Sequence, residues 1–237
     1  MITTWGADPA FNMGLDEALL GSRDAPVTLR FYTWSPDTLS IGYFQKLADV
    51  PGHERAGARV RRITGGGAIH HVNELTFSIS AALAHPLYAG PVGESYRRVH
   101  DVLIAALAGF GIEARLRGEG ALSSDRDATG MCFHHSTTLD VAWADRKGIG
   151  SAQRRTQGRV LHHDSIKLGT SVLEGNVATI RAHAPAADVH AVAEAVKREL
   201  ARAFGIAFET AVPDADERQA ARELGRRYVS PEFLARR

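Results

Sequence analysis

Apolar side chains recur at helical spacing in three stretches of the chain, and we expect a helix in each. The first stretch runs from Asp8 to Leu20, the clearest from Glu94 to Ala108, and the third from Asp188 to Phe204. Glycines follow the second and third stretches, where they commonly end a helix. A further stretch, Asp214 to Arg227, is highly charged and predicts a mostly exposed helix.

Between these helices the pattern changes to short β-branched and aromatic segments, which are typical of strands. The expected strands are Val27–Thr33, Thr38–Tyr43, Ala58–Ile63, Glu74–Ser80, Leu139–Trp143 and Val160–Leu168, the last with a partner strand through Ile149. The strands cluster, and the helices do not alternate regularly with them. We therefore expect one α/β (α+β) domain over residues 1–237, with mixed, largely antiparallel sheets flanked by helices. Residues 118–130 are polar and rich in glycine, and predict a mobile loop.

Composition narrows the class of protein. The 237 residues are 44% hydrophobic and 23% charged, with a formal net charge of +1, so no global field favours nucleic acid or a membrane surface. The longest apolar run, Val102–Ile112, is too short to span a bilayer, and the N-terminus has no secretory signal pattern. A single cysteine excludes an internal disulfide framework. These features predict a soluble cytoplasmic protein.

Three consecutive glycines, at positions 65–67, lie between the pair Arg61 and Arg62 and the pair His70 and His71. Glycine lets another group approach the backbone closely, so the triplet fits a ligand wall flanked by cationic side chains. It equally fits a tight turn between two strands. The spacing matches neither a P-loop nor a Rossmann motif, so nucleotide binding has little support from it.

Adjacent histidines occur three times, at positions 70/71, 134/135 and 162/163. Neighbouring residues on a strand point to opposite faces, so at most one of each pair faces a common site. The spacing also differs from that of familiar zinc motifs, and we expect no functional metal site.

Two further residues are candidates for catalysis. Cys132 follows the glycine-rich loop and precedes a basic cluster; nearby cations raise the thiolate fraction of a cysteine, which then accepts acyl groups from thioesters. Burial as a small apolar residue is the alternative. Lys147 lies just before Gly148 and Gly150, where its ammonium could polarise a carbonyl, unless it is simply a solvated lysine at a turn.

Together these segments resemble the lipoate–protein ligase and octanoyltransferase family, which shares its catalytic fold with biotin–protein ligases. The resemblance is carried, in the family's order, by NMGLDEALL (12–20), FYTWSPDTLSIGYFQ (31–45), RRITGGGAIHH (61–71), ELTFS (74–78), ESYRRVHDVLIAALAGFGI (94–112), LDVAWADRKGIGSAQRR (139–155) and VLHHDSIKL (160–168). It covers nearly the whole chain, and the Arg-Arg-x-x-Gly-Gly-Gly block with the later Lys-x-x-Gly-Ser-Ala-Gln is specific.

The resemblance implies an enzyme that attaches an octanoyl or lipoyl chain to one lysine of a carrier domain. It implies Lys147 and Cys132 as catalytic residues. The acyl-binding residues that it implies are Arg62, Gly65, Gly66, Gly67, His71, Gly150, Ser151 and His163. The expected partners are octanoyl-acyl carrier protein or free lipoate or octanoate as donors, and lipoyl domains and the glycine-cleavage H protein as acceptors, without nucleic acid or membrane.

Two activities occur in this family. Transferases take octanoate from acyl carrier protein through a cysteine thioester and need no cofactor; ligases use ATP and Mg²⁺ to form lipoyl-AMP, usually with an accessory domain. We favour the transferase, because Cys132 is present, Val72 replaces the family's usual Asp after the histidine, and the chain has no room for the accessory domain. A ligase whose accessory domain is a separate chain, and a non-catalytic carrier-binding paralogue, are the alternatives.

Overall fold

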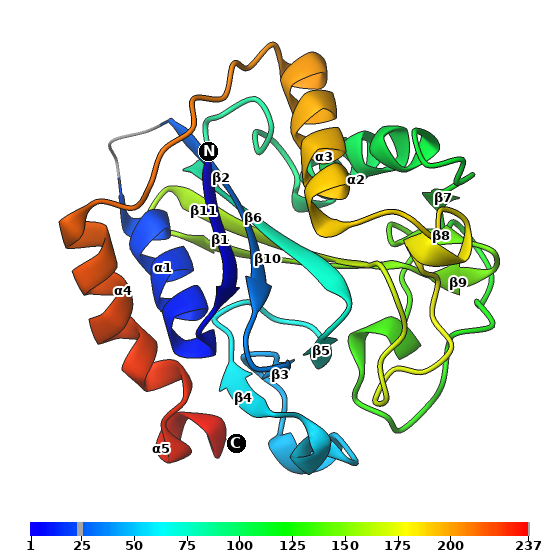
Figure 1. Cartoon of the computed structure of the whole chain (residues 1–237), viewed down its shortest axis with the longest axis horizontal. Helices are drawn as coiled ribbons and strands as arrows, with labels where there is room; N and C mark the ends of the chain where they lie inside the picture. Colours follow the sequence, from blue (N-terminus) through cyan, green and yellow to red (C-terminus); the bar gives the residue numbers. More distant parts are fainter. Residues whose placement is uncertain (23–25, 237) are drawn as a thin grey trace.

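The structure is a computed structural model that describes residues 1–22 and 26–236. Its central sheet consists, in spatial order, of β1 (Ile2–Ala7), β2 (Val27–Trp34), β6 (Glu74–Ala82), β11 (Arg159–Lys167) and β10 (Ile149–Thr156) (Figure 1). β1 is parallel to β2, and all other neighbours are antiparallel. The expected mixed, largely antiparallel sheet is confirmed.

Two small three-stranded sheets lie beside the central one. The first contains β4 (Ala58–Arg61), β3 (Thr38–Ile41) and β5 (Ile69–His71), in that order. The second contains β7 (Arg115–Leu116), β8 (Val141–Trp143) and β9 (Arg146–Lys147). The expected strands on either side of the glycine triplet therefore belong to different sheets, β4 to a small one and β6 to the central one. The triplet is not the turn of a hairpin between them.

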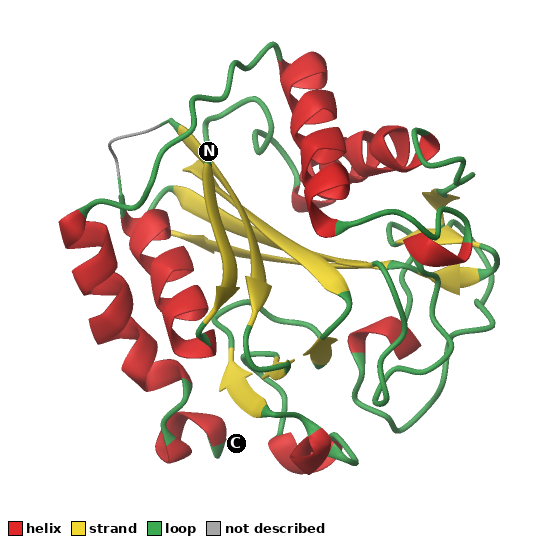
Figure 2. Cartoon of the chain, in the orientation of Figure 1, coloured by secondary structure: helices red, strands yellow, loops and turns green. Residues whose placement is uncertain are grey.

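Four long helices cover the two faces of the central sheet (Figures 1 and 2). They are α1 (Pro9–Gly21), α2 (Val92–Ala108), α3 (Val189–Phe204) and α4 (Ala215–Tyr228). α1 and α4 pack together on one face, which we call the pocket face. α2 and α3 pack together on the other, which we call the helix face, and share the main apolar core with Phe77 and Ile79 of β6. All four helices were expected, with ends shifted by one or two residues.

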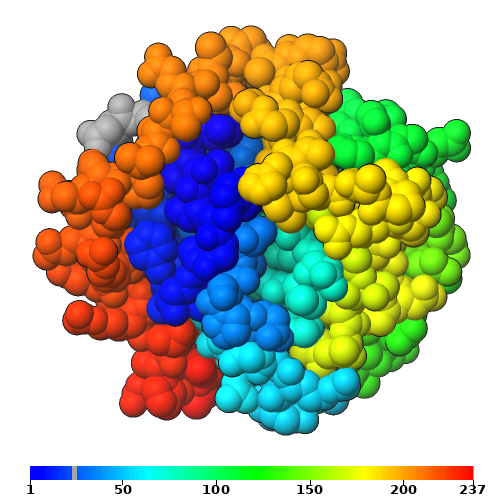
Figure 3. All heavy atoms as spheres, viewed as in Figure 1, coloured from blue at the N-terminus to red at the C-terminus, as the bar shows by residue number. Residues whose placement is uncertain are grey.

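Short elements complete the fold and were not expected from the sequence. One-turn helix α5 (Pro231–Leu234) follows α4, and 3₁₀ turns occur at Leu47–Asp49, His53–Arg55, Cys132–His134 and Ile180–Ala182. Edge strand β1 lies between segments from the C-terminal third of the chain (Figure 3). Ile2 forms a bridge with Ala211, so the open edge of the sheet is partly covered. Within the described residues, no helix has the length and apolar character needed to cross a membrane.

Candidate active site

A narrow cavity of ≈ 20 Å³, enough for about one water molecule, lies between the pocket face of the central sheet and the small sheet β4-β3-β5. It is lined by Met13, Tyr32, Trp34, Ser40, Arg62, Ile69, His71, Thr76, Cys132, Gly150, Ser151, Ala152, His163, Asp164 and Ser165. Six of the ten predicted site residues are in this lining. The other four, the three glycines at 65–67 and Lys147, support the lining from outside.

Cys132 begins the 3₁₀ turn at one wall of this cavity and is 8% exposed. Its backbone N–H donates to the carbonyl of Ala68 (2.7 Å). Two of the predicted glycines make room for it: a Cβ on Gly67 would lie 2.8 Å from the Cys132 nitrogen, and one on Gly150 would lie 3.1 Å from its Sγ. These glycines therefore allow the cysteine to sit close to two strands.

Lys147 is buried on β9, and the sulfur of Cys132 is close enough to influence the ionisation of its ammonium. Its Nζ donates to Asp140 Oδ2 (2.9 Å) and to the carbonyl of His135 (3.0 Å). Burial opposes the charge of Lys147, but Cys132 and Asp140 outweigh it and hold the pKa of the lysine above its ordinary value. Lys147 is thus a fixed cation beside the sulfur rather than a proton acceptor.

Arg62 binds the backbone of the loop that contains Gly65, Gly66 and Gly67, which we call the glycine loop. Its Nη2 donates to the carbonyls of Gly65 and Gly67 (2.7 Å each), and its Nη1 donates to Ser40 (3.1 Å to the carbonyl and 3.0 Å to Oγ). Burial lowers the pKa of Arg62 to about 10, which still leaves it charged at neutral pH. Gly66 has φ +91°, and a Cβ there would lie 3.1 Å from Arg62 Nη2, so a side chain at this position would strain the loop and displace the arginine.

His71 stacks on Trp34 at one side of the cavity, with ring centroids 4.2 Å apart. Its Nδ1 lies 2.6 Å from Glu74 Oε1 and its Nε2 lies 2.8 Å from Ser40 Oγ. Burial lowers the pKa of His71, and the neutral ring can donate to the carboxylate and accept from the hydroxyl. Burial alone would raise the pKa of Glu74, but His71 and Lys167 hold it at about 2.

His163 extends from β11 toward α1 and meets a buried carboxylate that the sequence analysis did not single out. Its Nε2 lies 2.8 Å from Asp16 Oδ2. Arg30 Nη1 and the hydroxyls of Tyr32 and Ser78 also donate to Asp16, at 2.7–2.8 Å. Burial alone would raise the pKa of Asp16, but Arg30 and His163 hold it well below its ordinary value. This network forms a rigid base under the cavity.

The strand register shows why neighbouring residues of β10 and β11 serve different faces. His163 pairs with Ser78 on the pocket face, whereas His162 pairs with Ile79 on the helix face, as expected for adjacent residues of a strand. Ser151 pairs with Asp164, and its hydroxyl donates to that carboxylate. The side chain of Ser151 therefore binds a buried acid of the helix face, in addition to its place in the cavity wall.

Residues 118–130, where we expected a loop, contain no helix or strand. Hydrogen bonds nevertheless hold the middle of this loop against neighbouring residues. Ser124 is fully buried, and its Oγ accepts a hydrogen bond from the backbone N–H of Lys147 (3.0 Å). Ser123 N–H donates to the carbonyl of Asp145 (3.0 Å). The loop thus supports the strand that carries Lys147.

Three acids of the site escaped the sequence analysis: Asp16, Asp140 and Asp164. Asp16 lies in the helical stretch between Leu15 and Leu19, and an acid among buried positions is the one signal that could have revealed it. Asp140 and Asp164 lie in strand-like segments whose partners are far apart in the sequence, so no local pattern identifies them.

A family profile described as the lipoyl protein ligase A/B catalytic domain matches residues 8–202. An octanoyltransferase LipM of Moorella thermoacetica is 40% identical over 175 residues, which are 71% of this chain and 64% of that protein. The match therefore spans less than two thirds of the Moorella protein. The octanoyltransferase LipM of Kyrpidia tusciae is 32% identical over 270 aligned residues, covering 100% of this chain and 98% of that protein.

Solved structures agree on the fold. A protein of T. acidophilum, solved with bound lipoic acid and described as a candidate lipoate protein ligase, superimposes with a TM-score of 0.81 at 23% identity, covering 99% of this chain and 97% of that one. A lipoate-protein ligase A bound with ATP gives a TM-score of 0.79 at 22% identity over 99% of this chain and 96% of that one. At such identities the likeness establishes the fold alone.

Proposed function

The chain belongs to the lipoyl protein ligase A/B catalytic domain family, and we propose that it is an octanoyltransferase that carries the acyl group on Cys132. The single observation that supports this chemistry most directly is the placement of Lys147. A buried ammonium, fixed by Asp140, interacts with the only cysteine of the chain at the wall of the cavity. The relatives described above are octanoyltransferases, in agreement with this chemistry.

In the first half-reaction, the Cys132 thiolate attacks the carbonyl carbon of an octanoyl thioester on acyl carrier protein. The tetrahedral intermediate collapses with release of the carrier thiolate, leaving octanoyl-Cys132. Lys147 stabilises negative charge first on the sulfur and then on the developing oxyanion. Because its pKa is raised, Lys147 carries its proton when the Cys132 thiolate attacks.

In the second half-reaction, the neutral amine of a lysine on the lipoyl domain or H protein attacks the thioester. An amide forms, the Cys132 thiolate leaves, and the amine proton passes to water, which balances the carrier thiolate released in the first half-reaction. The acyl energy is already stored in the thioester, so neither ATP nor a metal ion is required for either step. ATP and Mg²⁺ would be needed only in the ligase alternative.

The cavity must widen for this reaction. Its ≈ 20 Å³ cannot hold an eight-carbon chain. Met13 and Ile69 are apolar lining residues, and rotation of the flexible, unbranched side chain of Met13 is the least costly way to admit the acyl group. Arg62, His71 and His163 of the lining are tied by the hydrogen bonds described above and stay in place.

The expected acceptors are acidic carrier domains, and one surface suits them. A cavity of ≈ 330 Å³ is lined by Arg154, Arg159, Arg227 and Arg236. Ile63 also lines it, directly after Arg62 of the active site in the sequence. We assign the docking of the acyl carrier protein or lipoyl domain to this basic surface.

The test is intact-mass spectrometry after incubation with octanoyl-acyl carrier protein in the absence of ATP. The expected result is a gain of one octanoyl group that hydroxylamine removes and that Cys132→Ala and Cys132→Ser abolish. Subsequent addition of a lipoyl domain should return the enzyme to its original mass. If no adduct forms, but a lipoyl domain is modified once ATP and lipoate are supplied, the chain is a ligase and the proposal fails.

A further inference from the structure

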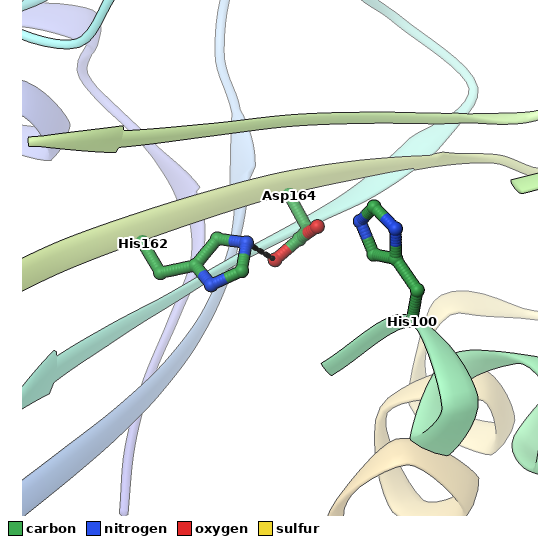
Figure 4. A group of neighbouring side chains, drawn as sticks. All are labelled: His100, His162 and Asp164. Carbon is green, nitrogen blue, oxygen red and sulfur yellow. Dashed lines mark ion pairs between the residues drawn. The ribbon is translucent and has the colours of Figure 1, made fainter. Parts of the chain in front are cut away.

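A second cluster of potential ligand groups lies on the helix face of the central sheet, and one of its members, Asp164, also lines the active-site cavity. His162 and Asp164 are two residues apart on β11 and therefore point to the same face. His100 approaches them from α2, and the carboxylate of Asp164 lies between the two imidazoles (Figure 4). All three side chains are at most 1% exposed.

The spacing of the donor atoms is close to that of a coordination shell. One ligand atom from each residue lies within 4.8 Å of the other two. His162 Nε2 and Asp164 Oδ2 are 3.3 Å apart. Tetrahedral zinc, with bonds of about 2.0–2.1 Å, places its donors roughly 3.3 Å apart. One edge of the shell already has this length, and the remaining pairs need a modest inward rotation of the imidazoles.

Two of these atoms lack hydrogen bonds. His162 Nε2 and Asp164 Oδ2 face each other at 3.3 Å, but neither forms a hydrogen bond of adequate geometry with this or any other partner among residues 1–22 and 26–236, although both are fully buried. Buried polar atoms without partners are uncommon in folded proteins and call for an explanation such as an ion.

The surrounding contacts orient the other donors. His100 Nδ1 lies 2.6 Å from the carbonyl of Leu139, so Nδ1 carries the proton and the lone pair of Nε2 faces the cluster. Ser151 Oγ lies 2.8 Å from His100 Nε2 and also contacts Asp164, which places a fourth donor atom, this one a hydroxyl oxygen, at the same point. Gln153 lies 3.3 Å from His162 Nδ1, and its amide can turn so that Oε1 accepts from that nitrogen.

We propose that His100, His162 and Asp164 bind one divalent transition-metal ion, and that Zn²⁺ is the ion best suited to this donor set. Two neutral imidazoles and one carboxylate are common zinc ligands, and Ser151 Oγ or a water completes a tetrahedron. The ion would tie α2 to β10 and β11. Because His100 also holds Leu139, which precedes Asp140, it would help to fix the partner of Lys147. The adjacent histidine pairs provided no reason to expect a metal site, because this group combines residues of a strand with one from a distant helix.

The site does not depend on the proposed acyl transfer, so the test measures metal without substrate. The untagged protein is saturated with Zn²⁺, dialysed against metal-free buffer, and its zinc content determined by inductively coupled plasma mass spectrometry. We expect about one zinc per chain. His162→Gln and Asp164→Asn should each lose this zinc, whereas His163→Gln, on the opposite face of the same strand, should keep it. Replacement by Co²⁺ should give the visible d–d bands of a tetrahedral nitrogen–oxygen site.

Zinc near zero in folded wild-type protein would overturn the proposal. So would a zinc content that is the same in wild type and in both cluster variants, because the metal would then be on surface histidines. If the variants do not fold, the Co²⁺ spectrum of the wild type decides alone: bands of octahedral, aquo-like Co²⁺ or no bands contradict the site.

Discussion

Two aspartates, Asp16 and Asp164, occupy opposite faces of the same sheet and are equally buried, at 1% exposure each. Asp16 receives hydrogen bonds from Arg30, Tyr32 and Ser78 and also contacts His163, and its pKa lies well below its ordinary value. Asp164 has the Ser151 hydroxyl but no arginine or lysine ion pair among the described residues, and burial raises its pKa to about 8. The depth of burial is the same, so the difference comes from the fixed cation.

The same rule applies to Glu74, another buried acid of the molecule. Its partners His71 and Lys167 hold its pKa at about 2. They keep a charge inside the protein that burial alone would remove. Asp164 is the exception in the described structure, and a divalent cation bound there would supply the charge that Arg30 supplies to Asp16.

The largest effect is expected when the cation beside Cys132 is removed. Lys147→Ala should slow octanoyl-Cys132 formation by about 10³-fold, because thiolate and oxyanion both lose their buried positive partner. Quenched-flow mass spectrometry measures this rate, and circular dichroism verifies the fold. Lys197→Ala, which removes a partly exposed lysine paired with Glu194 on α3, is the matched control and should leave the rate unchanged. A Lys147→Ala enzyme of wild-type speed would contradict the mechanism.

Arg30→Met should lower the free energy of unfolding by about 3–5 kcal/mol, since it leaves Asp16 as a buried charge without its cation. Urea denaturation followed by tryptophan fluorescence measures the change. Arg97→Met, at an exposed position of α2, serves as the control. The double variant Arg30→Met/Asp16→Asn should recover part of the loss, and failure to recover any would show that Arg30 acts through packing instead.

The lowered pKa of Glu74 predicts that the folded protein loses stability in acid. Its pKa is lowered from 4.5 to about 2, so the carboxylate stabilises the fold above about pH 4.5, and this contribution disappears as the pH falls toward 2. At neutral pH we expect Glu74→Gln to cost about 3 kcal/mol. Thermal unfolding of the wild type and of Glu74→Gln should be measured between about pH 6 and about pH 3, a range around the ordinary carboxyl pKa. The difference in stability between the two proteins should become smaller as the pH falls. A gap that stays constant would mean that ionisation of Glu74 is not involved.

The smallest effect is expected at Asp164. In protein treated with a chelator at pH 7, most of this carboxyl is already uncharged, because its pKa is raised to about 8. Asp164→Asn should therefore change the free energy of unfolding by less than about 1 kcal/mol, whereas Asp16→Asn should cost about 3 kcal/mol by leaving Arg30 unpaired. Chemical denaturation of the two variants side by side provides the measurement. Equal losses of stability in Asp16→Asn and Asp164→Asn would contradict the predicted difference between the two aspartates.

Much of the fold follows from local pattern. The helix expected at Asp188–Phe204 occurs at Val189–Phe204, and the strand expected at Val160–Leu168 occurs at Arg159–Lys167. Both have long, regular periodicity, which fixes an element without knowledge of its neighbours. β1 and α5 were missed because they are short, and their stability comes from pairing or packing with segments that are distant in the sequence.

The site shows the same division between features that follow from local sequence and features that depend on contacts between distant segments. Motifs in the sequence indicated Cys132 and Lys147, and the structure places Cys132 at the cavity wall and buries Lys147 on β9. The sequence could not indicate that Asp140 holds the lysine, or that His100 on α2 meets Asp164 on β11. These pairs depend on how helices and strands are packed in three dimensions, and no spacing along the chain encodes them.

Arg61 is next to Arg62, which binds the glycine loop. The hydrogen-bond partners of Arg61 are synthesised late, so the order of synthesis influences when the active site can form. Its fully buried guanidinium donates to the carbonyls of Phe233 and Leu234 in α5, at 2.7 Å each, across 172 and 173 positions of sequence. During translation Arg61 leaves the ribosome long before these partners exist. The nascent chain can therefore bury this arginine with its full set of acceptors only after residue 234 has emerged. We expect the glycine loop to be among the last parts of the molecule to settle, which would delay activity until most of the chain has been made.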